Sequence, residues 1–127
     1  MGLSEGRVSA VVAVSDMERG RAFYEDKLGL SAGEEGPDGG REYSCGGGTA
    51  LYVYPSPGNA GGSGATQAAW SVDDVDGTVD ELIAKGVTFE QYGDPFNTDE
   101  KGIARLGGDA IAWFKDPDGN ILGISSM

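Results

Sequence analysis

The stretch AVVAVSDMERGRAFYEDKLGL (Ala10–Leu30) decides the fold, because a blurred copy returns later as AAWSVDDVDGTVDELIAKGV (Ala68–Val87). In each copy a short apolar run reaches Ser-Asp or an acidic pair, then opens into a helix-like segment that a glycine closes. Apolar runs of this kind predict buried strands, and Ser and Asp are typical first residues of helices. The repeat therefore predicts two copies of one strand–helix unit.

Further strands are expected after each copy. In the first half the predicted strands are Arg7–Val14, Arg41–Cys45 and Thr49–Tyr54, the last two separated by the Gly46–Gly48 turn. Ser15 stands three residues before Glu18, a spacing that predicts a capping box at the start of the first helix. The run PSPGNAGGSGA (Pro55–Ala65) has the composition of a linker.

The second half repeats the pattern. Its predicted strands are Gln67–Val72, Val87–Tyr92, Ile111–Lys115 and Asn120–Ser125. Asp73 or Asp74 is expected to cap the helix, whose predicted buried stripe is Val75, Val79, Leu82 and Ile83. DPDG (Asp116–Gly119) predicts a type I turn between the last two strands. The segment 93–109 has weak periodicity and is expected to lie over or beside another element.

These elements predict an α+β fold made of two βαβββ modules. A chain of 127 residues is expected to be one domain, with module one at about 7–55, the linker at about 55–65 and module two at about 66–127. The single helix of each module covers one sheet face only. Two modules side by side would form a curved mixed sheet, and its free concave face would enclose a cavity.

The bulk charge excludes some partners. The net charge is −12 with a pI near 4.1, which argues against nucleic acid and anionic membranes and favours cationic ligands, although the acidity can also serve solubility alone. Cys45 is the single cysteine, which indicates a cytoplasmic protein without an internal disulfide. Neither a secretory signal pattern nor an apolar run of membrane-spanning length is expected.

Several motifs resemble one superfamily. Val14-Ser15-Asp16, Phe23-Tyr24 and Leu28-Gly29-Leu30 in the first module, with IAWFKDPDGN (Ile111–Asn120) in the second, resemble the vicinal oxygen chelate superfamily. It groups glyoxalase I, bleomycin resistance proteins and extradiol dioxygenases, and the resemblance spans almost the whole chain. It implies a homodimer with two pockets at the subunit boundary, often formed by module exchange.

The resemblance also locates a metal site that this chain lacks. The family's metal ligands fall at Ser9, Gln67 and Gly123, and the sequence contains no histidine. A catalytic divalent metal needs about three nitrogen or carboxylate donors. Serine is a poor ligand, glutamine is neutral and glycine has no side chain. We therefore expect no metal and no cofactor, which argues against a metal-dependent glyoxalase or dioxygenase.

Strand alternation predicts which side chains face the cavity. If Ser9 and Gln67 point inward, Tyr52 and Tyr54 do so as well, while Trp70 faces a helix as core. The family pattern adds Trp113, and the irregular segment of the second half offers a cover. The expected ligand-binding residues are Tyr52, Tyr54, Trp113, Gln67, Ser9, Phe96 and Tyr92. The alternative is that these aromatic side chains only fill the sheet.

The expected function is metal-independent binding of a small molecule. The resemblance to metal-free antibiotic-binding members, and a Gly-, Ala- and Asp-rich composition typical of actinomycetes, predict sequestration of a planar aromatic or cationic antibiotic and hence drug resistance. Two alternatives stay open: a metal-independent lyase or isomerase with a Tyr or carboxylate base, and a protein that only pairs with another. Cys45 lacks a histidine to activate it and is expected to be an inert thiol.

Overall fold

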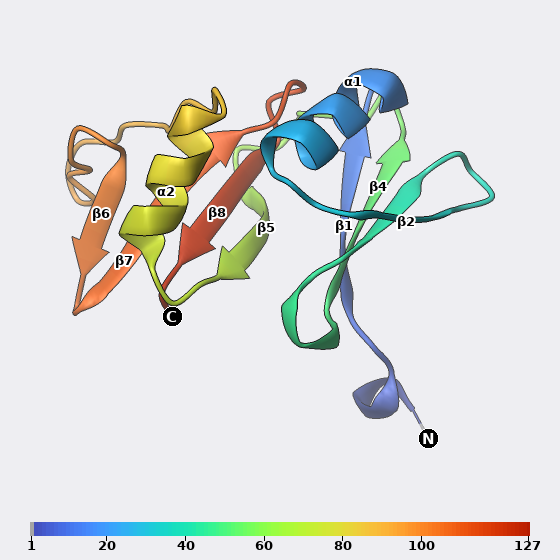
Figure 1. Ribbon diagram of the computed structural model, residues 1–127, viewed down its shortest axis with the longest axis horizontal. Helices are drawn as coiled ribbons and strands as arrows, with labels where there is room; N and C mark the ends of the chain where they lie inside the picture. Colours follow the sequence, from blue (N-terminus) through green and yellow to red (C-terminus); the bar gives the residue numbers. More distant parts are fainter. Residues whose placement is uncertain (1) are drawn as a thin grey trace. The chain divides into compact units, whose positions relative to one another are not determined.

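The computed structural model describes residues 2–127, and the chain divides into two compact units (Figure 1). The first unit ends at Gly61 and the second is Gly62–Met127, so the boundary falls inside the predicted linker. Each unit has the element order strand, helix, three strands. The α+β class and the two βαβββ modules are therefore confirmed, and their strands pair in two separate four-stranded mixed sheets.

The first sheet has the strand order β1-β4-β3-β2. Its strands are β1 (Ser9–Val14), β2 (Ala32–Glu35), β3 (Arg41–Ser44) and β4 (Ala50–Pro55), and a 3-10 turn, η1 (Leu3–Glu5), precedes them. Strands β1 and β4 run parallel, and the other pairs are antiparallel. Alternate residues are buried as the sequence predicts: Val12, Val14, Leu51 and Val53 lie in the core, while their strand neighbours remain accessible.

The helix of the first unit starts and continues differently from the prediction. The N-cap of α1 (Met17–Arg21) is Asp16, whose Oδ1 accepts hydrogen bonds from the backbone N–H of Glu18 (2.9 Å) and Arg19 (3.2 Å). The predicted Ser15 capping box is therefore wrong, because the extended residue at the helix start is Asp16 and Ser15 lies one position outside. The helix continues as the π-helical segment η2 (Ala22–Lys27).

The second sheet has the order β5-β8-β7-β6, with β5 and β8 parallel. Its elements are β5 (Thr66–Ser71), α2 (Val75–Ala84), β6 (Ile103–Leu106), β7 (Asp109–Lys115) and β8 (Ile121–Ser125), and α2 packs against β7 (Figure 1). The turn predicted at Asp116–Gly119 is present, with the Gly119 N–H donating to the Asp116 carbonyl at 2.9 Å. No helix in residues 2–127 combines the length and the apolar composition needed to cross a bilayer.

One predicted strand of the second module is wrong. Val87–Tyr92 forms only an isolated bridge between Phe89 and Phe114, although Val87 and Phe89 are buried as their alternation suggests. The second strand of the module is β6, inside the segment expected to be irregular. Gly107 and Gly108, both with positive φ, form a two-residue loop between β6 and β7, and such glycine pairs favour tight hairpins. That pair is the signal the sequence analysis missed.

Helix α2 follows its prediction except at one position. Asp74 is the N-cap, and its Oδ1 accepts from the Gly77 N–H at 3.0 Å. Val75 and Val79 are buried and Leu82 is half-buried. Ile83 is 43% exposed, so its place in the buried stripe is wrong. The buried face of this short helix is narrower than the spacing of its apolar residues predicts, and Ile83 lies at the edge of that face.

Candidate functional site

A cavity of about 380 Å³ lies in the second unit beside three aromatic rings. The Trp113 ring is 5.4 Å from the Tyr92 ring, edge to face, and 5.1 Å from the Phe96 ring at a tilt of 56°. The rings of Tyr92 and Phe96 are 6.2 Å apart. The lining consists of Gly64, Ala65, Thr66, Tyr92, Phe96, Trp113 and Ile121, and we call this site the aromatic pocket.

The indole of the aromatic pocket is placed by the alternation of β7. Ala112 and Phe114 are buried on the side where Phe114 contacts Phe89 and Trp70. Trp113 points to the opposite face of the sheet, beside Gly123 of β8. Trp70 stacks on Phe114 with ring centroids 6.4 Å apart, so it packs on the core side as expected.

The other two rings come from a loop that closes on itself. The Thr98 hydroxyl accepts from the Tyr92 N–H at 2.8 Å and donates to the Tyr92 carbonyl at 3.1 Å, and the Thr98 N–H donates to the same carbonyl at 3.0 Å. The Gly93 carbonyl accepts from the N–H groups of Phe96 and Asn97. These bonds fix Tyr92 and Phe96 at the two sides of one turn, and Phe96 remains 39% exposed.

The residues that line the aromatic pocket are all uncharged. None of its seven lining residues carries a charge at neutral pH, and three of them are aromatic. Aromatic faces attract flat apolar ligands by stacking and edge contact. The geometry therefore suits a planar molecule, and it offers no acid or base poised near neutral pH.

A second aromatic surface lies on the first unit. Tyr52 and Tyr54 of β4 stack with ring centroids 6.4 Å apart and planes 16° from parallel; we call them the tyrosine pair. They lie on the sheet face opposite Leu51 and Val53, which pack in the core. The Tyr52 hydroxyl donates a hydrogen bond to the Asp38 carboxylate, which lowers the pKa of Asp38 and raises that of Tyr52.

The seven predicted site residues separate into three groups. Tyr92, Phe96 and Trp113 come together in the aromatic pocket, and Tyr52 and Tyr54 form the tyrosine pair. Ser9 and Gln67 are exposed, and the Gln67 side chain donates to the Ala65 carbonyl at 3.0 Å, outside the pocket lining. Sequence reasoning missed Gly64 and Ala65 as lining residues, because it assigned them to the linker.

Comparison with known families assigns the fold. The family model of the Glyoxalase/Bleomycin resistance protein/Dioxygenase superfamily matches residues 7–124. The chain belongs to this superfamily. A search of curated proteins found no match.

Solved structures share the fold of this superfamily member. A glyoxalase/bleomycin resistance protein from Catenulispora acidiphila DSM 44928 is 24% identical, with a TM-score of 0.68 over 94% of this chain and 96% of that one. TnmS3, an antibiotic binding protein from Streptomyces sp. CB03234, is 23% identical, with a TM-score of 0.65 over 94% and 95%. Lactoylglutathione lyase from Agrobacterium tumefaciens is 18% identical, with a TM-score of 0.69 over 95% and 92%.

The metal positions of the superfamily hold residues that do not fit a metal. Among residues 2–127, no group of three or more His, Cys, Asp or Glu side chains could hold an ion. In the second unit the position at Gly123 is flanked by the Trp113 indole, whose Cδ1 would lie 3.7 Å from a Cβ built there. An aromatic ring thus packs beside the position where the resemblance places a ligand, and glycine there offers no donor, so we derive no chemistry through a metal.

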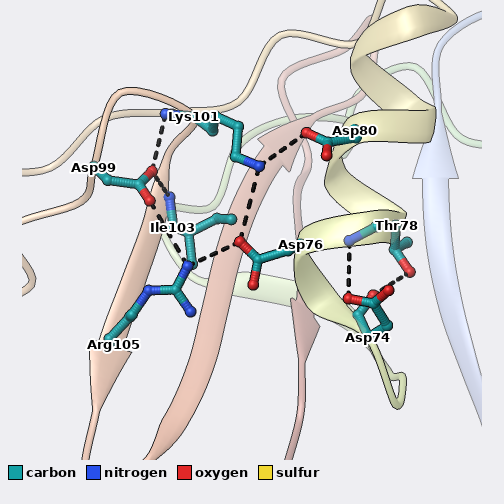
Figure 2. Close-up of polar contacts among 9 residues, drawn as sticks. Asp74, Asp76, Thr78, Asp80, Asp99, Lys101, Ile103 and Arg105 are labelled. Atoms are coloured by element: carbon teal, nitrogen blue, oxygen red, sulfur yellow. Dashed lines mark hydrogen bonds and ion pairs between the residues drawn. The ribbon is translucent and has the colours of Figure 1, made fainter.

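The charged clusters of this superfamily member are structural. Asp76 of α2 pairs with Arg105 of β6 at 2.8 Å, and Lys101 pairs with Asp80 at 2.9 Å. Figure 2 draws both pairs. The hydrogen bond from Arg105 lowers the pKa of Asp76. Since these carboxylates are held by cations, they connect α2 to β6 and to the loop before it rather than serve as free bases.

Proposed function

We propose that this superfamily member binds a planar aromatic small molecule, such as an antibiotic, and sequesters it chemically unchanged. The observation that carries the proposal is the aromatic pocket, about 380 Å³ in volume, with three aromatic rings and no charged lining residue. Cavities of this size and composition suit flat drug-sized ligands or their ring systems. Drug resistance would follow because bound compound is withdrawn from its target.

Two further observations support sequestration. The fold is that of TnmS3, itself an antibiotic binding protein, at 23% identity. The net charge of −12 raises the local concentration of cationic compounds around the protein. We also propose that the protein works in the cytoplasm and that it forms a homodimer. Sedimentation equilibrium at micromolar protein concentration tests the dimer, and the mass of a monomer would contradict it.

The alternative is a metal-independent lyase or isomerase, and the candidate residues favour binding over it. An acid–base catalyst works best with a pKa near the working pH. The hydrogen bond between Tyr52 and Asp38 moves the two pKa values in opposite directions, away from neutrality. The aromatic pocket itself contributes only the Tyr92 phenol as a titratable group.

The experiment uses the two tryptophans as separate reporters. Trp70→Phe leaves Trp113 as the single tryptophan, and Trp113→Phe leaves Trp70, which packs on the core side. Both variants are titrated with a panel of planar aromatic antibiotics after chelator treatment. We expect saturable fluorescence changes in Trp70→Phe, and weaker affinity by about tenfold in Trp113→Ala, because a stacked aromatic contact contributes on the order of 1 kcal/mol beyond the area it buries.

The fate of the bound compound separates binding from catalysis. After the titration, the protein is denatured and the compound is identified by mass spectrometry. Recovery of unchanged compound supports sequestration. A new product would replace the proposal with the lyase or isomerase alternative. No response of Trp113 to any compound in the panel would contradict binding in the aromatic pocket.

A further inference from the structure

The tip of Tyr52 is enclosed by a five-residue turn, GPDGG (Gly36–Gly40), between β2 and β3. One oxygen of Asp38, Oδ1, accepts from both the Tyr52 hydroxyl and the Gly40 N–H, the latter at 2.9 Å. The turn is closed by hydrogen bonds from the Gly36 N–H to the Gly40 carbonyl (2.9 Å) and from the Gly39 N–H to the Gly36 carbonyl (3.1 Å). The phenol is therefore anchored at its far end.

The glycines of the turn make room for that hydroxyl. A Cβ at Gly36 would collide with the Tyr52 hydroxyl oxygen, and a Cβ at Gly40 would lie 2.6 Å from it and 2.8 Å from the Val53 carbonyl oxygen. Gly40 is buried. A Cβ at Gly36 would push the Tyr52 hydroxyl out of its present place, and a Cβ at Gly40 would also meet a backbone carbonyl, so the turn holds Tyr52 in this position because both residues are glycine. We call the turn with its Asp38 the tyrosine holder.

The second ring of the tyrosine pair has no such support. Tyr54 stacks on Tyr52, but within residues 2–127 its hydroxyl has no hydrogen-bond partner. The holder therefore acts on one ring of the two. A ring fixed at its tip loses little freedom when a flat ligand stacks on it, so the holder lowers the entropic cost of binding.

The surroundings of the tyrosine pair are negative. The cross-strand neighbours of Tyr52 are Val11 on β1 and Glu42 on β3, and the Glu42 side chain lies on the same sheet face and is exposed. Asp38 adds a second exposed carboxylate at the tip of Tyr52. Phenol rings present a negative face to cations, and adjacent carboxylates strengthen that attraction.

We propose that the tyrosine holder fixes Tyr52 as a stacking plate, and that the tyrosine pair with Asp38 and Glu42 selects a planar cation over an uncharged planar molecule. Asp38 is a positioning residue for the ring and also supplies charge. This inference rests on the proposed function, because it names the class of small molecule that the protein takes. It concerns the surface of the first unit alone.

The test compares N-methylacridinium, a planar three-ring cation, with acridone, an uncharged three-ring molecule, on the full chain. Asp38→Asn keeps an acceptor for the Tyr52 hydroxyl and removes the charge. We expect it to weaken N-methylacridinium binding about threefold to fivefold and to leave acridone unchanged. Tyr52→Phe removes the anchor and keeps the ring, so it weakens both compounds. Asp26→Asn removes the same charge from an exposed position on η2, outside the tyrosine pair and its holder, and is the matched control, expected to leave both affinities unchanged.

A second measurement needs no ligand, because it follows the ionisation of the tyrosine hydroxyl groups directly. Carbon-13 NMR of labelled tyrosine, assigned with Tyr54→Phe, reports the ionisation of Tyr52. The hydrogen bond to Asp38 raises the pKa of Tyr52, so Asp38→Ala, which removes the acceptor, is expected to lower the pKa of Tyr52 toward its ordinary value. An unchanged titration would overturn the holder.

The remaining outcomes separate this inference from the proposed function. If Tyr52→Phe leaves both affinities as they are in the wild type, the holder is overturned. If Asp38→Asn leaves the preference for the cation unchanged, the selection of a cation is overturned. Either result leaves the Trp113 response, and with it the aromatic pocket, intact. A silent Trp113 with a cation preference that depends on Asp38 would refute the pocket and support the holder.

Discussion

Glu25 illustrates how one residue links the π-helical segment to the sheet. Its carboxylate accepts from Arg21 Nε at 2.6 Å and from the hydroxyl of the fully buried Tyr43 at 2.8 Å. The hydrogen bond from Arg21 is the largest cause that lowers the pKa of Glu25 below its ordinary 4.5. Segments of π-helix are rare and often occur at functional sites. Here the segment carries the residue that connects η2 to β3.

The pH dependence of stability should report this carboxylate. A carboxyl group whose pKa is lowered by folding stabilises the protein above its unfolded pKa, and that contribution is lost as pH falls through the folded pKa. Relative to Glu25→Gln, the wild type should therefore lose stability below about pH 4.5. Urea unfolding from pH 7 to pH 3 measures the difference. Glu34→Gln, at an exposed position, is the control, and parallel curves for wild type and Glu25→Gln would contradict the prediction.

Gly102 is the residue where a methyl group is expected to cost most in the second unit. It has φ +88°, and a Cβ there would lie 2.8 Å from the Phe89 Cβ and 2.9 Å from the Glu90 carbonyl oxygen. Gly108 has a similar φ of +91° with nothing within 4 Å, so Gly108→Ala isolates the backbone penalty. We expect Gly102→Ala to lower the free energy of unfolding by about 1–3 kcal/mol more than Gly108→Ala. Equal losses in urea titrations would show that Phe89 yields to the methyl group.

At the scale of the element, two substitutions in α2 compare the contributions of a buried and a partly exposed apolar side chain to stability. Val79 is fully buried and Ile83 is 43% exposed. Val79→Ala should cost about 2 kcal/mol, since it removes two buried methyl groups and leaves a cavity. Ile83→Ala removes more carbon but should cost under about 1 kcal/mol, because much of that carbon is in water. Urea unfolding measures both, and a larger loss for Ile83→Ala would place that side chain against another surface in solution.

The elements also show what the sequence could reveal. The alternation of apolar residues correctly identified the buried faces of β1 and β4, because every second side chain of a half-buried strand points into the core. It failed at Val87–Tyr92, where Phe89 is buried but forms only one bridge. The alternation of apolar residues therefore indicates which side chains are buried, but not whether the backbone pairs with a neighbouring strand. The segment η2 is π-helical, and no residue type in Ala22–Lys27 distinguishes it from an ordinary α-helix, so the sequence did not predict it.

The site was predictable to the extent that it depends on aromatic side chains of single elements. Trp113 was predicted from the family pattern, and Tyr92 and Phe96 from the irregular segment of the second half. Ser9 and Gln67 were expected from the superfamily's metal geometry, which this chain has replaced, and neither lines the aromatic pocket. The tyrosine holder was not predicted, because GPDGG reads as an ordinary turn until the Tyr52 hydroxyl is placed inside it.

At the scale of the whole molecule, the excess of acidic residues should act on ligand association. Twenty-one Asp and Glu oppose nine Lys and Arg, and the resulting field extends about 10 Å from the surface at 0.1 M salt but only about 3 Å at 1 M. If this field concentrates cations, the affinity for N-methylacridinium should fall about tenfold over that range, chiefly through the association rate. Acridone carries no charge, so the field of the protein is expected to leave its affinity unaffected.

Stopped-flow measurement of the ligands' own fluorescence on mixing with the wild-type protein gives both association rates, since both three-ring compounds fluoresce. The neutral compound is an internal control, because salt also strengthens apolar burial and would raise the affinity of both molecules together. The informative quantity is therefore the ratio of the two affinities at each salt concentration. A ratio that falls with salt assigns the acidity of the chain a role in ligand capture. A constant ratio would contradict that role and leave solubility as the purpose of the charge.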